Sequence, residues 1–431
     1  FLFSIPDFLK SLQQGVSGIQ YFQQLKNQGF SCCIGGIPEV SDELKATYLT
    51  PLQLKNFNSS GILYGCMAGM DAWKDAGLKI DDEGAVDYDT GIIFGTGQSG
   101  VDKFREAIYK LDQGQVRRLG SNTVSQTMSS GISAYLGGIL GCGNQVSTNS
   151  SACTTGTEAI LMGAERIQNG KAKRMLVGSC SDHGTYIWGG FDAMRVMTYK
   201  HNDSPEKGSR PMSASASGFV PGSGAGALLL EDLDSAKARG AFIYAEILGG
   251  HINSGGQRNG GTMTAPNSVA VQKCIESALA DAGIKAVEID TINGHLTATS
   301  KDSLEIKNWK KENLTAFNTV THWEGTQTAY QPNVSTSLST NDLAEIIQHS
   351  RNNPLAIPVF NQQQFKQMAE YFAPIFLLDE SGDADKIGRP IWSEKKQVTI
   401  DHSQPVSFVR LEYTRFNGAI LPQLVYSIWF T

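Results

Sequence analysis

The chain has 431 residues, a hydrophobic content of 40% and 46 glycines, which suits a large buried core and excludes a disordered chain. Its net charge of -6, with no strongly basic segment, argues against nucleic acid as the main partner. We find neither a secretory signal nor an apolar run long enough to cross a bilayer. We therefore expect a cytoplasmic protein without a membrane span.

Helices and strands are predicted to alternate from about residue 40 to 310, which is typical of an α/β fold. Thr50-Pro51 predicts the start of a long helix that Gly77 ends. Apolar spacing predicts another helix that starts at Cys153 and ends at Gly170. Strands are predicted at residues 90–97, 174–180, 224–232, 241–250 and 287–292, and a further helix at 268–282.

The composition changes after residue 313. Only four of the 46 glycines and none of the seven cysteines lie in residues 314–431. We predict a helix at residues 362–373 and strands at 404–413 and 421–430 in this segment, and we treat it as a separate unit.

The sequence GTGQSG at residues 95–100 matches the G-x-G-x-x-G pattern of dinucleotide-binding turns. The acidic residue that would bind the ribose is absent, because GQVRRLG occupies the expected distance. We therefore favour a tight turn between a strand and a helix over a nucleotide site.

Cys153 lies in NSSACTTGTEAIL, between small polar residues and the predicted helix. A thiol at a helix N-terminus is favoured as thiolate by the helix dipole, which is worth about 0.3–2 kcal/mol. The dipole alone ionises the thiol only partly, so we expect an imidazole beside it. The alternative is that Cys153 is a compact apolar side chain, as we expect for the other six cysteines, none of which forms a C-x-x-C pair or a zinc spacing.

His295 is the imidazole that we pair with Cys153. It follows a predicted buried strand and precedes two hydroxyl residues, Thr297 and Thr299. A histidine at a strand end is otherwise a structural hydrogen-bonding residue, and that alternative stays open.

Three stretches together resemble the β-ketoacyl synthases, the condensing enzymes of fatty-acid and polyketide assembly. SSACTTGTEAI resembles the nucleophile motif, NGHLTATSKDSLEI resembles the His-Gly-Thr-x-Thr motif, and residues 189–249 resemble the long signature between them. The resemblance covers residues of about 5–312. It implies the thiolase-like αβαβα layered fold, with an N-terminal half at 1–235, the start of a C-terminal half at 236–313, and an unassigned segment at 314–431.

The resemblance also implies roles for single residues. Cys153 would be the acyl-carrying nucleophile and His295 a donor in decarboxylation. Thr297 and Thr299 would contact the pantetheine arm, and Phe191 would bind substrate. Neither a metal nor an organic cofactor is implied.

The sequence departs from the family pattern at several points. Leu296 replaces the glycine after His295, and Ser213 and Ser217 stand where acidic residues are common. The family's first strand has no counterpart, and neither the second catalytic histidine nor the late Gly-Phe-Gly-Gly loop follows residue 312. His322 does not fit the missing motif. Either unrelated sequence after residue 312 takes the place of the missing elements, or the C-terminal half cannot complete its fold. We favour the second interpretation.

The implied reaction transfers an acyl chain from an acyl carrier protein to Cys153 and condenses it with a malonyl thioester. We expect a homodimer or heterodimer. A second hypothesis is a non-catalytic partner subunit that binds carrier protein or sets chain length. Since carrier proteins are acidic, two basic clusters are candidate docking patches, with solvated helix ends as the alternative: Arg117 with Arg118, and Lys171, Lys173 with Arg174.

Overall fold

The computed structural model describes residues 5–55, 57–80, 84–255, 260–262, 267–289 and 291–312, and five strands after them. We use "N-terminal half" for residues 5–235 and "C-terminal half" for 236–312. The helices of the N-terminal half are α1 (Ile5–Gln14), α2 (Gln23–Asn27), α3 (Asp42–Tyr48), α4 (Pro51–Leu54), α5 (Ser60–Asp75), α6 (Val101–Asp112), α7 (Thr123–Thr127), α8 (Gly131–Leu140), α9 (Thr155–Gln168), α10 (Thr185–Ala193) and α11 (Leu233–Ala238), with short 3-10 turns at Val116–Arg118 and Pro205–Lys207. Its strands are β1 (Gln20–Tyr21), β2 (Ile34–Gly35), β3 (Thr90–Thr96), β4 (Val146–Ser147), β5 (Arg174–Ser181) and β6 (Gly224–Glu231).

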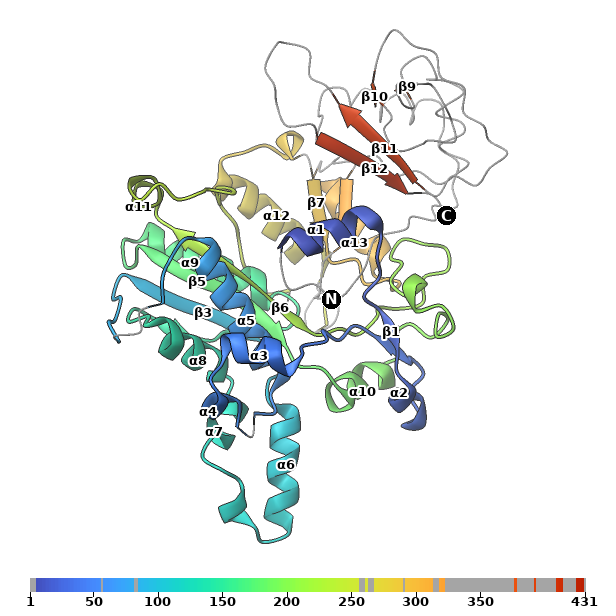
Figure 1. Ribbon diagram of the computed structural model, residues 1–431. Coiled ribbons are helices and arrows are strands. Elements are labelled where there is room, and N and C mark those ends of the chain that lie inside the picture. The colour runs from blue at the N-terminus through green and yellow to red at the C-terminus, as the bar shows by residue number, and fades with distance from the viewer. Residues whose placement is uncertain are drawn as a thin grey trace.

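A four-stranded sheet in the order β4-β3-β5-β6 forms the centre of the N-terminal half (Figure 1). β3 runs parallel to both β4 and β5, whereas β6 runs antiparallel to β5. All seven residues of β3 are buried, as expected for a central strand that is covered on both faces. The predicted strands at 90–97, 174–180 and 224–232 are confirmed as β3, β5 and β6.

Successive residues of the strands point to opposite faces of the sheet, and each face has its own helices. Ile92, Phe94 and Leu176 join a buried cluster with side chains of α5 and α8. Met175 and Val177, on the other face, join a cluster with Ala159 of α9. The result is a helix-sheet-helix sandwich, which is the layering that the sequence predicted.

Glycines let the helices approach the sheet and each other closely. A Cβ atom at Gly69 of α5 would lie 2.7 Å from Leu136 Cδ2 of α8, so Leu136 would have to move to admit it. Gly163 of α9 lies against Val177 of β5 in the same way. The abundance of glycine in this half therefore reflects close packing between layers.

A third buried cluster holds the segment between α10 and β6 against the beginning of the chain. Ile34 of β2, Trp188 of α10 and Val220 are buried together. Gly36 N donates to Pro221 O at 2.9 Å and Ser223 N donates to Gly36 O at 3.0 Å. This cluster fixes the long segment that leads from α10 to β6.

The prediction of one continuous helix from Thr50 to Gly77 is wrong, because the structure has two helices with a break between them. Thr50 caps α4 in a capping box with Gln53, as Pro51 indicated, but α4 ends at Leu54 and α5 starts only at Ser60. Asn58 N, between them, donates to Gln126 Oε1 at 2.6 Å. Asn58 N therefore forms a tertiary hydrogen bond in place of one within a helix. The spacing of apolar residues does not reveal such a contact.

The C-terminal half contains α12 (Ser268–Ala282), a 3-10 turn at Ala286–Glu288, β7 (Thr291–Gly294) and α13 (Asp302–Lys311). α12 confirms the predicted helix and ends at Gly283, whose φ of 66° is left-handed. The strand predicted at 287–292 is shifted, because the 3-10 turn takes its first residues and β7 begins at Thr291. β7 pairs in parallel with β8 (Asn318–Thr321).

The strand predicted at 241–250 is wrong. This segment is assigned to no strand of the described residues, and Phe242 and Tyr244 are 78% and 70% exposed. Their rings touch each other, with centroids 4.8 Å apart, rather than a neighbouring strand. Apolar residues of strand type do not form a strand unless another strand pairs with their backbone.

The strands beyond residue 313 include β9 (Phe376–Leu377), β10 (Ile391–Trp392), β11 (Phe408–Tyr413) and β12 (Leu424–Trp429), in one sheet of order β12-β11-β10-β9. β11 and β12 pair antiparallel and confirm the strands predicted at 404–413 and 421–430. The helix predicted at 362–373 lies outside the described residues. Within the described part of the chain, no helix combines the length and the apolar character that a membrane crossing needs.

Candidate active site

Cys153 lies in a tight turn between β4 and α9. Ser151 and Cys153 form an isolated bridge, and Ala152 between them has a left-handed φ of 51°. α9 begins at Thr155, two residues after the thiol, so the helix starts slightly later than predicted. A non-glycine residue with left-handed φ costs about 1–2 kcal/mol, which marks this turn as strained.

Side chains around the turn hold it in this conformation. Thr155 Oγ1 accepts from Ser151 N at 2.9 Å and donates to Ala152 O at 2.6 Å. Asn149 Nδ2 donates to Thr155 O at 2.9 Å and to Glu158 Oε2 at 3.1 Å. The sequence analysis did not identify Asn149 or Glu158 as supporting residues. The acidic residue in the first turn of α9 was the available signal.

The Gly-rich stretch at 95–100 packs against the turn that contains Cys153. β3 ends at Thr96, and α6 begins at Val101 after Gly100, whose φ is 67°. A Cβ at Gly95 would lie 2.5 Å from Asn149 Oδ1 and would also collide with Thr155. The stretch is thus a strand-to-helix turn, as we favoured, with one glycine that makes room for the cysteine turn.

The environments of the cysteines differ sharply. Of the seven, all of which the structure describes, Cys153 alone is exposed. Burial raises the pKa of Cys32, Cys66 and Cys142 to about 12 each. Burial also raises the pKa of the remaining three, Cys33, Cys180 and Cys274. A thiol with a raised pKa is a poor nucleophile, so reactivity is expected at Cys153.

His295 begins a second tight turn, which follows β7. We call residues 295–302 the histidine turn. Glu305 of α13 accepts from His295 N at 2.7 Å and from Leu296 N at 3.0 Å. Leu296 and Ala298 both have left-handed φ, at 26° and 57°, and both are buried. Leu296 therefore takes up the backbone conformation that suits glycine and adds a core side chain.

Asp302 closes the histidine turn. Its carboxylate is 7% exposed and accepts from Thr299 N at 3.4 Å. Burial raises the pKa of Asp302, against backbone hydrogen bonds from Thr299, Met212 and Thr297 that lower it. Thr297 and Thr299 lie side by side, with their Oγ1 atoms 3.1 Å apart. Glu305 and Asp302 were missed as supporting residues because both act through backbone N–H groups.

Phe191 is linked to the histidine turn through Phe219. Phe191 is 41% exposed in the last turn of α10, and its ring meets that of Phe219 edge to face at 5.6 Å. Gly218 N, adjacent to Phe219, donates to Ala298 O at 2.9 Å. The contact of Phe191 with the other predicted site residues and the pairing of His295 with Cys153 both stay predictions.

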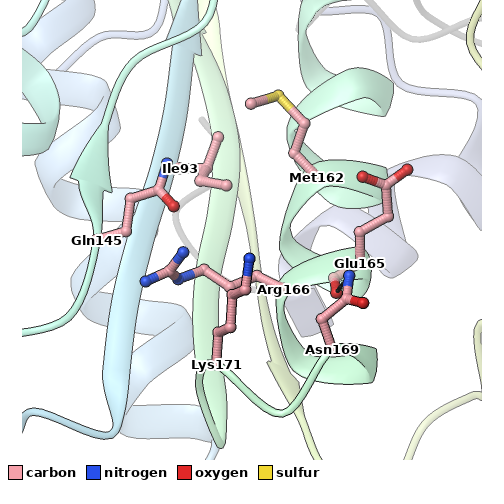
Figure 2. A pocket seen from close by; sticks show the side chains of 7 residues that line it. All are labelled: Ile93, Gln145, Met162, Glu165, Arg166, Asn169 and Lys171. Carbon is pink, nitrogen blue, oxygen red and sulfur yellow. Dashed lines mark hydrogen bonds between the residues drawn. The ribbon is translucent and has the colours of Figure 1, made fainter.

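A hollow of about 210 Å³ lies beside the C-terminal part of α9 (Figure 2). Figure 2 shows Met162, Glu165 and Arg166 of α9 facing Gln145 and Ile93 across it. α9 rises about 1.5 Å per residue, so this hollow is more than one helical turn away from Cys153. None of the residues predicted for acyl transfer lines it, whereas Lys171 of the second basic cluster does.

The two basic clusters differ in how their charges are satisfied. Arg174 donates to Asp87 Oδ2 at 2.9 Å and lies 3.4 Å from Glu231 Oε1. These ion pairs favour a structural role for Arg174, and docking at Lys171, Lys173 and Arg174 stays a prediction. Arg117 and Arg118 lie exposed in the 3-10 turn after α6 and keep that interpretation as a prediction.

Comparison with known proteins resolves the family. A model of the β-ketoacyl synthase N-terminal domain matches residues 57–236, and one of the C-terminal domain matches 244–313. The 3-oxoacyl-[acyl-carrier-protein] synthase 2 of Vibrio harveyi is 31% identical over 304 residues, which are 70% of this chain and 71% of the relative. The chain belongs to the β-ketoacyl synthase family. The chloroplastic 3-oxoacyl-[acyl-carrier-protein] synthase II of Arabidopsis thaliana is 35% identical over 68% of this chain, which spans 53% of that relative.

A solved structure supports the β-ketoacyl synthase fold independently. The ishigamide ketosynthase/chain length factor is 22% identical and superposes with a TM-score of 0.63 over 74% of this chain and 76% of that chain. The thiolase-like α/β fold predicted from the sequence is confirmed.

Proposed function

We propose that the protein is an acyltransferase of the 3-oxoacyl-[acyl-carrier-protein] synthase type, with Cys153 as its nucleophile. The observation that carries this proposal is the exposed thiol on a strained turn just before α9, in a chain whose other cysteines are wholly or partly buried. The thiolate attacks an acyl thioester of a carrier protein, and the carrier thiolate leaves and takes up a proton. The product of this step is an acyl thioester on Cys153.

His295 is proposed as the donor in the second step. A malonyl thioester loses carbon dioxide, and the electrons of the broken C–C bond form an enolate whose oxygen His295 stabilises. The enolate carbon then attacks the acyl carbonyl, and Cys153 leaves as thiolate. In this proposal Thr297 and Thr299, whose Oγ1 atoms are 3.1 Å apart, hold the pantetheine arm, and the partly exposed Phe191 contacts the acyl chain.

An acyl carrier protein is the proposed partner, because both relatives described above are named for it. Arg117 and Arg118 offer an exposed basic turn for an acidic carrier. We keep a homodimer or heterodimer, a cytoplasmic location, and the division at 1–235, 236–313 and 314–431 as parts of the proposal.

The second candidate function is a non-catalytic or impaired partner subunit. Two observations favour it. The match to the C-terminal domain model ends at residue 313, and the sequence after residue 313 lacks the motif of the second catalytic histidine. Removing one oxyanion donor slows comparable enzymes by about 10²- to 10³-fold. A chain with His295 alone would thus acylate but condense slowly.

Condensation tests the choice between these functions. We would incubate the protein with acyl-carrier and malonyl-carrier thioesters and measure carbon dioxide release and 3-oxoacyl thioester, with Cys153→Ala as control. The enzyme proposal expects product that the variant does not form. If the protein forms no more 3-oxoacyl thioester than the Cys153→Ala control, the enzyme proposal is wrong and the partner-subunit function is favoured.

A further inference from the structure

Asn149 lies shortly before Cys153 in the chain and connects the strand β3 to the helix α9. Its backbone oxygen accepts from Thr96 N at 3.2 Å, at the end of β3. Its side-chain Nδ2 donates to Thr155 O at 2.9 Å and to Glu158 Oε2 at 3.1 Å, both in the first turn of α9. Asn149 thus closes a loop that contains the proposed nucleophile.

The side-chain oxygen of Asn149 shows that α9 imposes this orientation of the amide. Oδ1 is buried and has no hydrogen-bond partner among the described residues. The opposite orientation would direct that oxygen at two other oxygens, those of Thr155 and Glu158. An unpaired buried oxygen costs free energy, which offsets part of what the two hydrogen bonds from Nδ2 contribute to stability. The net contribution of Asn149 to stability is therefore expected to be small.

The surroundings of Asn149 leave its side chain little room to move. A Cβ at Gly95 would lie 2.5 Å from Asn149 Oδ1, so the amide packs directly on the backbone of β3. The hydroxyl of Thr148, the preceding residue, is hydrogen-bonded to that of Ser133 in α8. The amide is therefore held between β3 and α9, and it fixes the first turn of the helix relative to the sheet.

The turn that Asn149 closes is strained and carries the exposed thiol. Ala152 has a left-handed φ of 51°, and such a conformation persists only where the surrounding structure holds it. Without that support the turn would relax and displace the thiol of Cys153. A displacement of about 1 Å is enough to slow a reaction that depends on the position of its nucleophile. On the basis of the proposed role of Cys153, we propose that Asn149 is a positioning residue for acyl transfer, which holds this turn in its reactive conformation.

The rate at which the full chain takes up an acyl group from an acyl-carrier thioester tests this role in Asn149→Leu. Leucine keeps the branched shape of asparagine but donates no hydrogen bond, so both bonds to α9 are lost. We expect the rate at saturating thioester to fall by roughly 5- to 30-fold, the factor that one or two hydrogen bonds are worth. The thioester concentration at half-maximal rate is expected to stay unchanged, because Asn149 acts through the turn and not on the substrate. The Tm is expected to stay within about 4 °C of that of the unmodified chain.

Asn169→Leu is the matched control at the other end of α9. Asn169 Nδ2 also donates to a backbone oxygen of this helix, that of Glu165, at 2.7 Å. This variant is expected to acylate at the rate of the unmodified chain. An unmodified chain that acquires no acyl group on Cys153 would overturn the proposed function and the positioning role with it. Equal rates in Asn149→Leu and Asn169→Leu, with an active unmodified chain, would overturn the positioning role alone.

Substitutions of Glu158 cover the case in which Asn149→Leu folds poorly. Glu158→Ala removes one of the two acceptors of the amide, at a partly exposed residue of α9. We expect the acylation rate to fall by about 5-fold, for the loss of one hydrogen bond. Glu158→Gln, whose side-chain oxygen still accepts from Asn149 Nδ2, is expected to acylate faster than Glu158→Ala. Equal rates in these two variants would overturn the positioning role.

Discussion

The N-terminal and C-terminal halves contain similar elements but bury them very differently. Ten of the sixteen residues of α5 are buried, whereas none of the fifteen residues of α12 is. The buried clusters described above belong to the N-terminal half, in which helices cover both faces of one sheet. Apolar periodicity therefore establishes that a helix forms, but burial depends on the surface that covers it.

The same contrast appears in the candidate site. The cysteine turn is supported by the side chains of Asn149, in the loop before it, and Thr155 of α9, while Gly95 of β3 leaves room for it. The histidine turn is supported chiefly by Glu305 and Asp302, which both belong to the helix that follows it. The proposed nucleophile thus belongs to the half with more burial, and its proposed partner belongs to the half with less burial.

The largest expected effect concerns core stability. Leu136→Ala removes a fully buried side chain of α8 and is expected to lower the free energy of unfolding by about 2–5 kcal/mol. Leu279→Ala, in partly exposed α12, is the matched control and is expected to cost less than about 1 kcal/mol. Urea unfolding of both variants measures the difference, and equal losses would refute the contrast between the halves.

His295→Ala is expected to separate activity from stability. Loss of one oxyanion donor lowers kcat for condensation by about 10²- to 10³-fold. The side chain is exposed, so the Tm of the variant is expected to stay within about 2 °C of the parent. Steady-state kinetics with a thermal melt checks both statements. A large fall in Tm would show that His295 acts through structure.

Acid should weaken the N-terminal half through its ion pairs. Burial alone would raise the pKa of Asp87, but hydrogen bonds from Thr90 and Arg174 outweigh it and hold the pKa below its ordinary value. Glu231 behaves alike through Arg239. A carboxylate whose pKa is lower in the folded than in the unfolded chain stabilises the fold at pH values above its unfolded pKa. This stabilisation is lost as the pH falls through the folded pKa. Stability is therefore expected to drop below about pH 4, and to drop less in Arg174→Met, as measured by unfolding across pH.

The smallest expected effect tests the strain at the cysteine turn. Ala152→Gly removes the strain of a left-handed alanine, which costs about 1–2 kcal/mol. It also raises the conformational entropy of the unfolded chain, which destabilises the fold by about 0.4–1 kcal/mol. Ala152 is exposed, so no burial is lost and a net gain of roughly 0.5–1 kcal/mol is expected. Ala134→Gly, at an exposed site inside α8, is expected to cost about 0.5–1 kcal/mol. Equal signs for the two variants would argue against strain.

Local patterns predicted the main strands of the N-terminal sheet and one of the helices that cover it. β3, β5, β6 and α9 follow from apolar runs and glycine ends. Cys153 and His295 were selected from their motifs, and their roles stay predictions. The break before α5 was missed because it depends on a hydrogen bond from Asn58 to the distant Gln126. Residues 241–250 were misassigned because a strand needs a partner that composition does not show.

The supporting residues of the site were beyond sequence reasoning for a related reason. Asn149 and Glu305 act by fixing backbone in left-handed turns, and their own local patterns are ordinary.

Peptide mapping by mass spectrometry after incubation with an acyl-carrier thioester tests whether Cys153 is the nucleophile. We expect one acyl adduct, on the peptide that contains Cys153, and none on Cys274, the partly exposed internal control. The adduct should be absent in Cys153→Ser under conditions that keep the thioester intact. A folded protein that carries no acyl group on Cys153, or carries it equally on Cys274, would show that Cys153 is not the nucleophile.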